Sequence, residues 1–229
     1  VFVGATGLAG PNAGGNGVIR YGMTRDSVLG LEAVLADGTV ITSMNRMIKN
    51  NAAYDVKQLF IGTEGTLGVI TRLVLRLRES PRSTQSALVA CPTFADVTRF
   101  LKHIDGALGG SLSAFELMWN EFYRMVTTPP SKGTPPLPQA YDYYVLVESA
   151  GGDPARDQAQ FEEAIAAAIE TGLVVDAVVC SSEAQRDALW ALRDDVEGIF
   201  RLGMPVAFDV SLPLAEMEGY VTEVLGRLK

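Results

Sequence analysis

Histidine and cysteine, the residues most used in metal sites and nucleophilic catalysis, are almost missing from this sequence. Its 229 residues include one histidine, His103, and two cysteines, Cys91 and Cys180. A single histidine argues against a histidine-based metal site or a Ser-His-Asp triad within the chain. Because the cysteines lack C-x-x-C spacing, we expect two buried free thiols rather than a zinc site or a disulfide framework. Free thiols are typical of a reducing compartment, so we expect a cytoplasmic location.

Positive charge and long apolar runs are also scarce. Lys and Arg total 19 against 27 Asp and Glu, which gives a net charge of −8 at pH 7. Nucleic-acid-binding surfaces are normally basic, so we expect no nucleic-acid partner and no attraction to an anionic membrane. No apolar run reaches the length of a membrane span, so we expect no transmembrane segment. The remaining composition, 48% hydrophobic and 20% charged, is that of an ordinary globular protein.

Glycine, by contrast, is concentrated in two short stretches. The first runs through the opening two dozen residues, at Gly4, Gly7, Gly10, Gly14, Gly15, Gly17 and Gly22, and the second spans residues 62–68. Glycine loses more backbone entropy on folding than any other residue, so such density indicates backbone that must approach something closely. Successive backbone N–H groups in such loops form concave sites for anions, so a phosphate-bearing cofactor is a candidate ligand.

The first 80 residues are predicted to form a glycine-rich loop followed by β structure. Asp37-Gly38 separates two strand-like runs, 29–35 and 39–42, and predicts a hairpin. Residues 50–60 are predicted to be a short helix or turn. Residues 68–71 and 73–77 are predicted to form a strand pair or one bent strand, and Pro81 marks a break.

After Pro81 the pattern changes to alternating short strands and helices. We predict strands at 85–91, 113–118, 141–147, 173–180 and 205–210, and helices at 93–104, 119–126, 153–169, 182–200 and 214–228. Five prolines between residues 127 and 139 predict an exposed loop. Such alternation is typical of a parallel sheet, but the short links fit a ferredoxin-like antiparallel sheet equally well.

Two signatures within residues 7–71 carry a family resemblance. The first comprises Asn12-Ala13-Gly14-Gly15, residues 19–22, 28–32 and 36–40, and the second is the stretch 54–71. In this order they resemble the flavin domain of the FAD-linked oxidases of the vanillyl-alcohol-oxidase (PCMH) type, in particular the D-2-hydroxyacid dehydrogenase branch. The resemblance implies an α+β fold: the C-terminal part of a PCMH-type FAD-binding domain at 1–80, then a ferredoxin-like antiparallel cap domain at 84–229.

The resemblance also implies where FAD is bound. It places FAD contacts in the first loop at Asn12, Ala13, Gly14 and Gly15, and contacts with the adenosine half at Glu64, Gly65, Gly68, Val69 and Ile70. The residues alone leave alternatives open: each glycine could serve only a tight turn, and Glu64 could be a helix cap or an ion-pair partner. Pro11 stands where the family usually has a small hydroxyl residue, which removes one N–H from the turn.

The cap region carries a further part of the resemblance, at residues 189–194. This tryptophan-x-x-arginine stretch resembles the family helix whose arginine binds the substrate carboxylate, and it implies that role for Arg193. An arginine suits the task because its planar fork meets a carboxylate at two points. The alternative is a surface ion pair with Asp194 or Glu197. Ala207 stands near the place of a lysine in the 2-hydroxyglutarate enzymes, which favours a smaller or more apolar hydroxy acid.

Two functional segments of the family are not found in the sequence. These are the main pyrophosphate loop and the His-x-Gly-Asp-Gly-Asn-x-His motif that supplies a metal site and the catalytic histidine. We therefore expect a chain incomplete at both ends, with its catalytic residue unknown, no metal ligands of its own, and a divalent metal only in the intact enzyme.

The resemblance implies one main function and leaves two alternatives. We expect hydride transfer from a D-2-hydroxy acid, such as D-lactate or glycolate, to N5 of FAD, an unidentified electron acceptor, and a homodimer as a candidate assembly. The alternatives are an alcohol or sugar oxidase on the same scaffold, and a non-catalytic flavin-fold module. Trp119 and Trp190 are expected to lie in the core or an interface.

Overall fold

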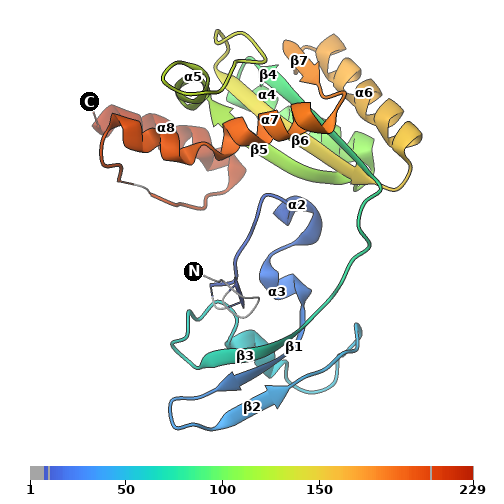
Figure 1. Ribbon diagram of the computed structural model, residues 1–229, viewed down its shortest axis with the longest axis vertical. Coiled ribbons are helices and arrows are strands. Elements are labelled where there is room, and N and C mark those ends of the chain that lie inside the picture. Colours follow the sequence, from blue (N-terminus) through green and yellow to red (C-terminus); the bar gives the residue numbers. More distant parts are fainter. Residues whose placement is uncertain (1–7, 10, 207, 229) are drawn as a thin grey trace. The chain divides into compact units, whose positions relative to one another are not determined.

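The computed structural model describes residues 8, 9, 11–206 and 208–228, and the chain divides into two compact units, Val1–Pro81 and Arg82–Lys229 (Figure 1). Gly4, Gly7 and Gly10 of the first glycine loop, and Ala207 in the second unit, lie outside the described residues.

The first unit is built on a three-stranded antiparallel sheet in the order β2-β1-β3. Its strands are β1 (Val28–Val34), β2 (Val40–Ser43) and β3 (Val69–Leu75). The turn between β1 and β2 closes where Leu35 N–H donates to Thr39 O at 2.9 Å, which confirms the Asp-Gly hairpin. The predicted strands at 68–71 and 73–77 form the single strand β3, whose pairing with β1 is irregular at two points.

A small core fixes the loops of the first unit to one face of this sheet. Its buried members are Ala9, Val28, Leu31, Ala33, Phe60, Ile61 and Ile70. Around it lie the short helices α2 (Val18–Tyr21) and α3 (Thr24–Ser27) and the 3₁₀ helix η1 (Val56–Leu59), which accounts for the predicted helix or turn at 50–60. The core therefore joins residues near both glycine loops.

The second unit contains a four-stranded sheet in the order β5-β6-β4-β7, with every pairing antiparallel. Its strands are β4 (Ser83–Cys91), β5 (Leu112–Trp119), β6 (Tyr143–Gly151) and β7 (Asp176–Val179). This order, with helices after the first and third strands, confirms the ferredoxin-like prediction. The parallel alternative is wrong, because a strand of opposite direction lies between β4 and β5, and another between β6 and β7.

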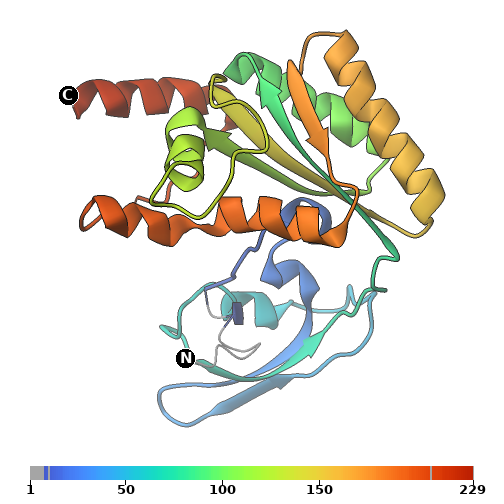
Figure 2. The same cartoon turned by 45° about the horizontal axis from the view of Figure 1, so that its top comes forward.

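Helices cover both faces of the second sheet (Figure 2). On one face α4 (Phe94–Leu108) and α6 (Pro154–Glu170) pack through Phe100, Ile104 and Phe161. On the other face α5 (Asn120–Thr127) and α7 (Glu183–Asp194) pack through Tyr123 and Leu189. His103 on α4 contacts α6, with its Nε2 2.9 Å from the carbonyl oxygen of Ala164. The single histidine therefore has a structural role.

Three of the predicted helix starts coincide with side-chain caps. Thr93, Asp153 and Ser182 each accept a hydrogen bond from the backbone N–H three residues on, and α4, α6 and α7 begin directly after them. The predicted helix at 182–200 divides at Asp195 into α7 and the 3₁₀ helix η2 (Val196–Leu202). The final helix is α8 (Leu214–Arg227), close to its predicted range.

Two strand predictions in the second unit need correction. The strand expected at 173–180 is limited to β7, because the backbone N–H groups of Leu173 and Val174 donate to the carbonyl oxygen of Ala168 in the last turn of α6, at 3.0 and 3.2 Å. The strand expected at 205–210 does not form in the part of it that the structure describes. Val206 and Phe208 are 78% and 82% exposed there, so this apolar run has no sheet partner among the described residues.

Candidate functional site

The two glycine loops of the first unit lie against one another. Gly62 N–H, at the start of the second loop, donates to the carbonyl oxygen of Ala9 in the first loop at 3.2 Å. A Cβ added to Gly62 would lie 3.5 Å from Cβ of Asn12, and φ of Gly62 is +88°. Glycine is needed here because an L side chain strains this left-handed backbone. The sequence signatures are therefore neighbours in space as well as in order.

Arg25 fastens the two loops together. Its backbone N–H donates to Asn12 Oδ1 at 2.8 Å, while Nη1 donates to Gln58 Oε1 at 2.6 Å and Nη2 to the carbonyl oxygen of Ile61 at 2.5 Å. Charge-assisted hydrogen bonds of this kind are stronger than neutral ones. Sequence reasoning missed Arg25, because it lies outside both glycine stretches and follows no spacing rule.

Asn12 folds the first loop. It has φ 54°, a left-handed conformation that asparagine tolerates better than most residues. Its side-chain oxygen is engaged by Arg25, and the next carbonyl, that of Ala13, accepts hydrogen bonds from Thr24 N at 3.0 Å and Thr24 Oγ1 at 2.6 Å. The side-chain oxygen of Asn12 and the carbonyl oxygen of Ala13 therefore hold the first loop in its conformation through these hydrogen bonds.

Gly14 and Gly15 differ in the space around the position where a Cβ would lie. A Cβ on Gly14 would lie 2.7 Å from Sδ of Met23, so packing within the unit requires that glycine. A Cβ on Gly15 would meet no atom within 4 Å. Among the described residues, none accepts a hydrogen bond from the backbone N–H groups of Gly14, Gly15 or Asn16. These exposed donors suit an anionic ligand such as a phosphate.

The second loop turns sharply at Glu64 and Gly65. Both have positive φ, 51° and 84°, and Thr66 N–H closes the turn on the carbonyl oxygen of Thr63 at 3.0 Å. Glu64 is exposed, and no ion pair of Glu64 is found within the described part of the chain. Packing within the unit requires glycine at position 68, because a Cβ there would lie 2.9 Å from the carbonyl oxygen of Val34.

Val69 and Ile70 begin the edge strand β3. Val69 is 63% exposed, whereas Ile70 is 9% exposed and belongs to the core. In the described sheet β3 pairs on one side only, so part of its backbone N–H and C=O groups face away from the sheet. A ligand can therefore meet Val69 through its side chain but can meet Ile70 only through the backbone.

These loops fit a dinucleotide cofactor. They offer exposed backbone donors at Gly14 and Gly15, open space where Gly15 lacks a side chain, and an available strand edge at Val69. The first features match a diphosphate, and a strand edge can pair with the polar edge of a purine ring. The predicted cofactor residues from both loops are thus brought into one unit of the structure.

Arg193, the predicted substrate residue, lies on α7 in the second unit and contacts two carboxylates. Nε and Nη2 donate to Glu116 Oε2 at 2.9 and 2.8 Å, and Nη1 donates to Asp194 Oδ1 at 3.1 Å. Burial lowers the pKa of Arg193, but the hydrogen bonds and charges of Glu116 and Asp194 outweigh that effect and raise it. The ion pair with Asp194 weighed in the sequence is present, and Glu116 was missed because it lies 77 residues away along the chain.

The tryptophan of the same helix is fixed to the sheet. Trp190 Nε1–H donates to Glu148 Oε2 at 2.9 Å, and Ser86 Oγ–H donates to the same oxygen at 2.9 Å. Trp119 at the end of β5 makes an edge contact with Tyr143, with ring centroids 6.4 Å apart. Both tryptophans therefore have packing partners within the second unit.

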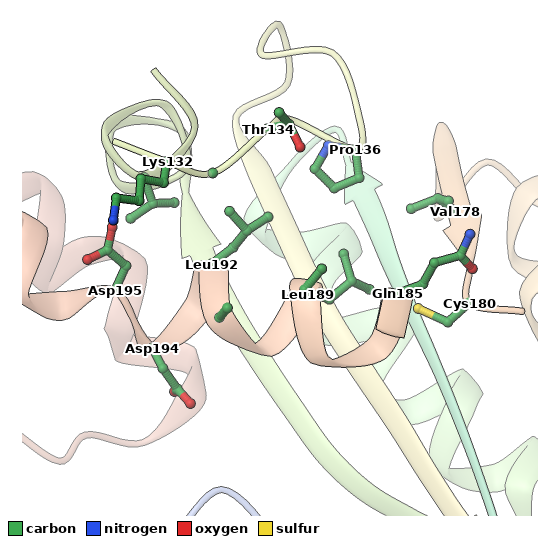
Figure 3. A pocket seen from close by; sticks show the side chains of 14 residues that line it. Lys132, Thr134, Pro136, Val178, Cys180, Gln185, Leu189, Leu192, Asp194 and Asp195 are labelled. Atoms are coloured by element: carbon green, nitrogen blue, oxygen red, sulfur yellow. The ribbon is translucent and has the colours of Figure 1, made fainter. Parts of the chain in front are cut away.

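A cavity of about 680 Å³ lies beside α7 (Figure 3). Leu189 and Leu192 form its apolar floor, Lys132 and Asp195 lie toward one end, and Cys180 toward the other. Arg193 is not among its lining residues. Burial raises the pKa of the Cys180 thiol, so it is protonated near neutral pH and is a weak nucleophile. The cavity can hold an apolar group, but it presents no catalytic arrangement.

Two searches of the described residues give negative results. No group of three or more His, Cys, Asp or Glu side chains in these ranges is placed to hold a metal ion. None of the helices in residues 8–228, leaving out the undescribed positions, is long and apolar enough to cross a membrane. The predicted effect of Ala207 concerns a residue outside the described ones.

Family models match both units. The model for FAD linked oxidases, C-terminal domain, matches residues 80–229, and the model for an FAD binding domain matches residues 2–43. The first of these covers more than half of the chain. The chain therefore belongs to the FAD-linked oxidases, and its cofactor class is FAD, as the glycine signatures predicted.

The curated relatives point to one branch of this family. The chain is 40% identical over 223 residues to D-2-hydroxyglutarate dehydrogenase, mitochondrial, of Bos taurus, covering 97% of this chain and 41% of the relative. It is 36% identical over 228 residues to the Rattus norvegicus enzyme of the same name, with 97% and 41% covered. A Schizosaccharomyces pombe protein, named provisionally as a mitochondrial D-lactate dehydrogenase, is 36% identical over 225 residues, with 97% and 42% covered. The chain thus spans about two fifths of the length of these relatives.

Solved structures share the fold at lower identity. An alkyldihydroxyacetonephosphate synthase matches 86% of this chain and 37% of its own, with a TM-score of 0.61 and 18% identity. A second crystal form of that enzyme gives a TM-score of 0.59 at 17% identity, covering 86% of this chain and 36% of its own. At this identity the likeness establishes the α+β fold alone.

Proposed function

We propose that this chain forms part of an FAD-dependent dehydrogenase that oxidises a D-2-hydroxy acid to the 2-oxo acid. The observation that carries the proposal is the joining of the two glycine loops, through Gly62 and Arg25, in a chain that also bears Arg193. The names of the bovine and S. pombe relatives support the substrate class.

The two parts of the chain have separate tasks in this proposal. Residues 1–80 hold the cofactor, with Gly14, Gly15 and the Glu64–Gly65 turn directed to its diphosphate and adenosine parts. Residues 84–229 form the substrate domain. The compact units Val1–Pro81 and Arg82–Lys229 support this division.

Arg193 binds the substrate carboxylate. A guanidinium stays charged and meets a carboxylate through two parallel N–H donors, which fixes the α-carbon as well as the acid group. Bound FAD supplies the acceptor for the hydride that leaves this carbon. We assign no residue of this chain as the base for the hydroxyl proton, and a divalent metal would be held by residues outside it.

A second candidate is an oxidase of uncharged alcohols or sugars on the same scaffold. It is favoured by one observation: Arg193 is already paired with Glu116 and Asp194. If these ion pairs persist when the substrate binds, the Arg193 guanidinium is not available to it. The enzyme would then recognise a substrate that has no carboxylate.

A substrate panel separates the two candidates. The intact FAD-loaded enzyme of which this chain forms part is assayed with an artificial electron acceptor against D-2-hydroxyglutarate, D-lactate and glycolate, and against alcohols of the same carbon skeleton without a carboxylate. We expect turnover of the acids only, and a loss of at least ~10-fold in kcat/KM for Arg193→Ala. Arg186→Ala on the same helix is the control, and an unchanged kcat/KM in Arg193→Ala would reject the assignment.

Location, assembly and electron acceptor complete the proposal. We keep a cytoplasmic location and a homodimer as predictions, although the relatives quoted above carry mitochondrial names. Fluorescence microscopy of the tagged protein tests the location, and light scattering tests the assembly. The choice between D-lactate, glycolate and a larger acid follows from the panel.

A further inference from the structure

Two carboxylates contact the Arg193 guanidinium, and they do so in different ways. Glu116 projects from β5 and accepts two hydrogen bonds on one oxygen, from Nε at 2.9 Å and Nη2 at 2.8 Å. Asp194 is the next residue on α7 and accepts one bond, from Nη1 at 3.1 Å. The Glu116 side chain is 21% exposed and that of Asp194 is 55% exposed. Glu116 is therefore the better fixed partner.

The donors that remain on Arg193 have a definite arrangement. A guanidinium carries five N–H donors in one plane: one on Nε and two on each terminal nitrogen. Glu116 takes the Nε donor and the Nη2 donor on the same side. One N–H of Nη2 remains, together with Nη1, and these form the end of the fork. A carboxylate can approach this end with one oxygen on each nitrogen.

The helix that carries Arg193 is itself anchored one turn earlier. Trp190 donates to Glu148 on β6, and residues three apart on a helix share a face. Glu116 lies opposite Leu146 on β6, and Glu148 is two residues further along β6, so both glutamates are on the same face of the sheet. The hydrogen bond from Trp190 to Glu148 fixes α7 to the sheet, and the two bonds to Glu116 orient the Arg193 guanidinium.

We propose that Glu116 is the positioning residue for Arg193: it holds the guanidinium so that its Nη1–Nη2 end is presented to the substrate carboxylate. Asp194 occupies part of that end in the free protein, and the substrate carboxylate displaces it. This inference rests on the proposed function, since it assigns Arg193 to the substrate. It adds Glu116 on strand β5, a residue that orients the Arg193 guanidinium and does not itself bind the substrate.

Charge explains why the two acids must behave differently. Glu116 and Asp194 together give the Arg193 cluster one excess negative charge. A substrate carboxylate would be repelled by that cluster unless one acid leaves the guanidinium. Asp194 can leave at little cost because exposed ion pairs are weak. Glu116 is more buried and makes two bonds, so it stays.

Kinetics of three variants of the intact FAD-loaded enzyme that contains this chain test the proposal. Glu116→Ala removes the acceptor, and we expect KM for the hydroxy acid to rise about 10-fold or more, with a smaller change in kcat. Glu116→Gln keeps an oxygen that can accept from Nε and Nη2, and we expect KM to return to within about 3-fold of the wild type. Asp194→Asn removes the competing charge, and we expect KM to fall about 2- to 5-fold.

A control and an independent readout keep the test decisive. Glu163→Ala, on the exposed face of α6, is the control and should leave KM unchanged. NMR of the 229-residue chain reads the Arg193 Nε–H signal directly, without cofactor or substrate. We expect a signal protected from solvent exchange in the wild type and in Glu116→Gln, and its loss in Glu116→Ala.

The outcomes separate failure of this inference from failure of the proposed function. An Nε–H signal that persists in Glu116→Ala overturns the positioning role, as does equal KM in Glu116→Ala and the wild type. Absence of hydroxy-acid turnover by the intact wild-type enzyme rejects the proposed function instead. In that case the Arg193 Nε–H signal of Glu116→Ala, read without substrate, still decides whether Glu116 orients the guanidinium: its loss supports that role and its persistence overturns it.

Discussion

The two units of the chain are stabilised in different ways. In the second unit, helices cover both faces of the sheet, and large side chains such as Phe100, Tyr123 and Phe161 are completely buried. Large apolar residues are exposed in both units, for example Tyr54 at 95% in the first and Phe208 at 82% in the second. The units differ in what they bury, because the described part of the first unit has one small core. Its loops depend on backbone hydrogen bonds and on Arg25. The comparison teaches that the second unit is stabilised by packing, whereas the first is shaped by its loops.

Side-chain capping of helices occurs at three helix starts of the second unit and at neither α-helix start described in the first. In the second unit α4, α6 and α7 begin with a side-chain cap from Thr93, Asp153 or Ser182, whereas α5 and α8 have no side-chain cap bond. In the first unit, Gly17 and Met23 precede α2 and α3 without a side-chain cap bond of their own. Short uncapped helices gain stability only from their surroundings.

The largest effect is expected from a cavity in the second unit. Phe100→Ala removes a ring that is 0% exposed, and we expect the free energy of unfolding of this unit to fall by about 4 kcal/mol. Urea denaturation followed by tryptophan fluorescence measures it, because Trp119 and Trp190 both lie in this unit. Phe100→Leu is the control, with a loss of about 1 kcal/mol. A loss below about 1 kcal/mol for Phe100→Ala would contradict the claim that packing stabilises the second unit.

High pH should weaken the second unit through Cys91. Burial, and then the charge of Asp96, raise the pKa of this thiol from 9.0 to about 12. The unfolded thiol ionises above pH 9 while the folded one stays neutral, so stability is present below pH 9 and falls as pH rises toward 12. The slope approaches about 1.4 kcal/mol per pH unit well above pH 9, and the expected loss between pH 9 and 11 is about 2 kcal/mol.

The variant Cys91→Ala isolates this contribution. It is less stable than the wild type at pH 7, but its unfolding free energy should decline less steeply between pH 9 and 11. Parallel urea titrations at several pH values give the two slopes. Equal slopes in both proteins would show that Cys91 is not the group that titrates.

Loss of Arg25 tests the account of the first unit. Arg25→Ala removes the bonds to Gln58 and Ile61, and we expect a loss of about 2 kcal/mol of local stability and at least ~10-fold weaker FAD binding. Hydrogen exchange of the Gly62 N–H and an FAD titration give the two values. Arg72→Ala, whose side chain is 70% exposed, is the control, with about 0.5 kcal/mol. Similar results for both arginines would contradict the role of Arg25.

The smallest effect is expected from a helix cap. Thr93→Ala removes the acceptor of the Asp96 N–H bond and should cost the second unit about 1 kcal/mol. Thermal unfolding measures the change, and Thr93→Ser, which keeps the hydroxyl, should restore it. If neither variant differs from the wild type, capping contributes nothing to the contrast between the units.

Local signals predicted much of the fold. Asp37-Gly38 marked the hairpin, Thr93, Asp153 and Ser182 marked helix starts, and short links allowed the antiparallel order. The strand predicted at 205–210 was wrong because an apolar run needs a neighbouring strand, which the sequence pattern does not supply. Helix 182–200 was predicted too long because nothing at Asp195 signals a break.

The candidate site was predicted in part. Gly14, Gly15 and Gly65 stand out because clustered glycines are visible in the sequence, whereas Glu64 was named only through the family resemblance. Partners that act across long separations leave no such pattern. Arg25 reaches residues more than 30 positions away, and Glu116 reaches Arg193 across 77. Both were found only when the folded chain brought them together.

The most direct test of the central claim, that the glycine loops bind FAD, is the FAD dissociation constant of Gly15→Ala. A methyl group there meets no atom of the protein and its backbone is not left-handed, so the fold should be unchanged. Gly106→Ala, in α4 with equally open space, is the control. The account predicts FAD binding at least ~10-fold weaker for Gly15→Ala and unchanged for Gly106→Ala. Equal affinity in both variants, with folding intact, would contradict it.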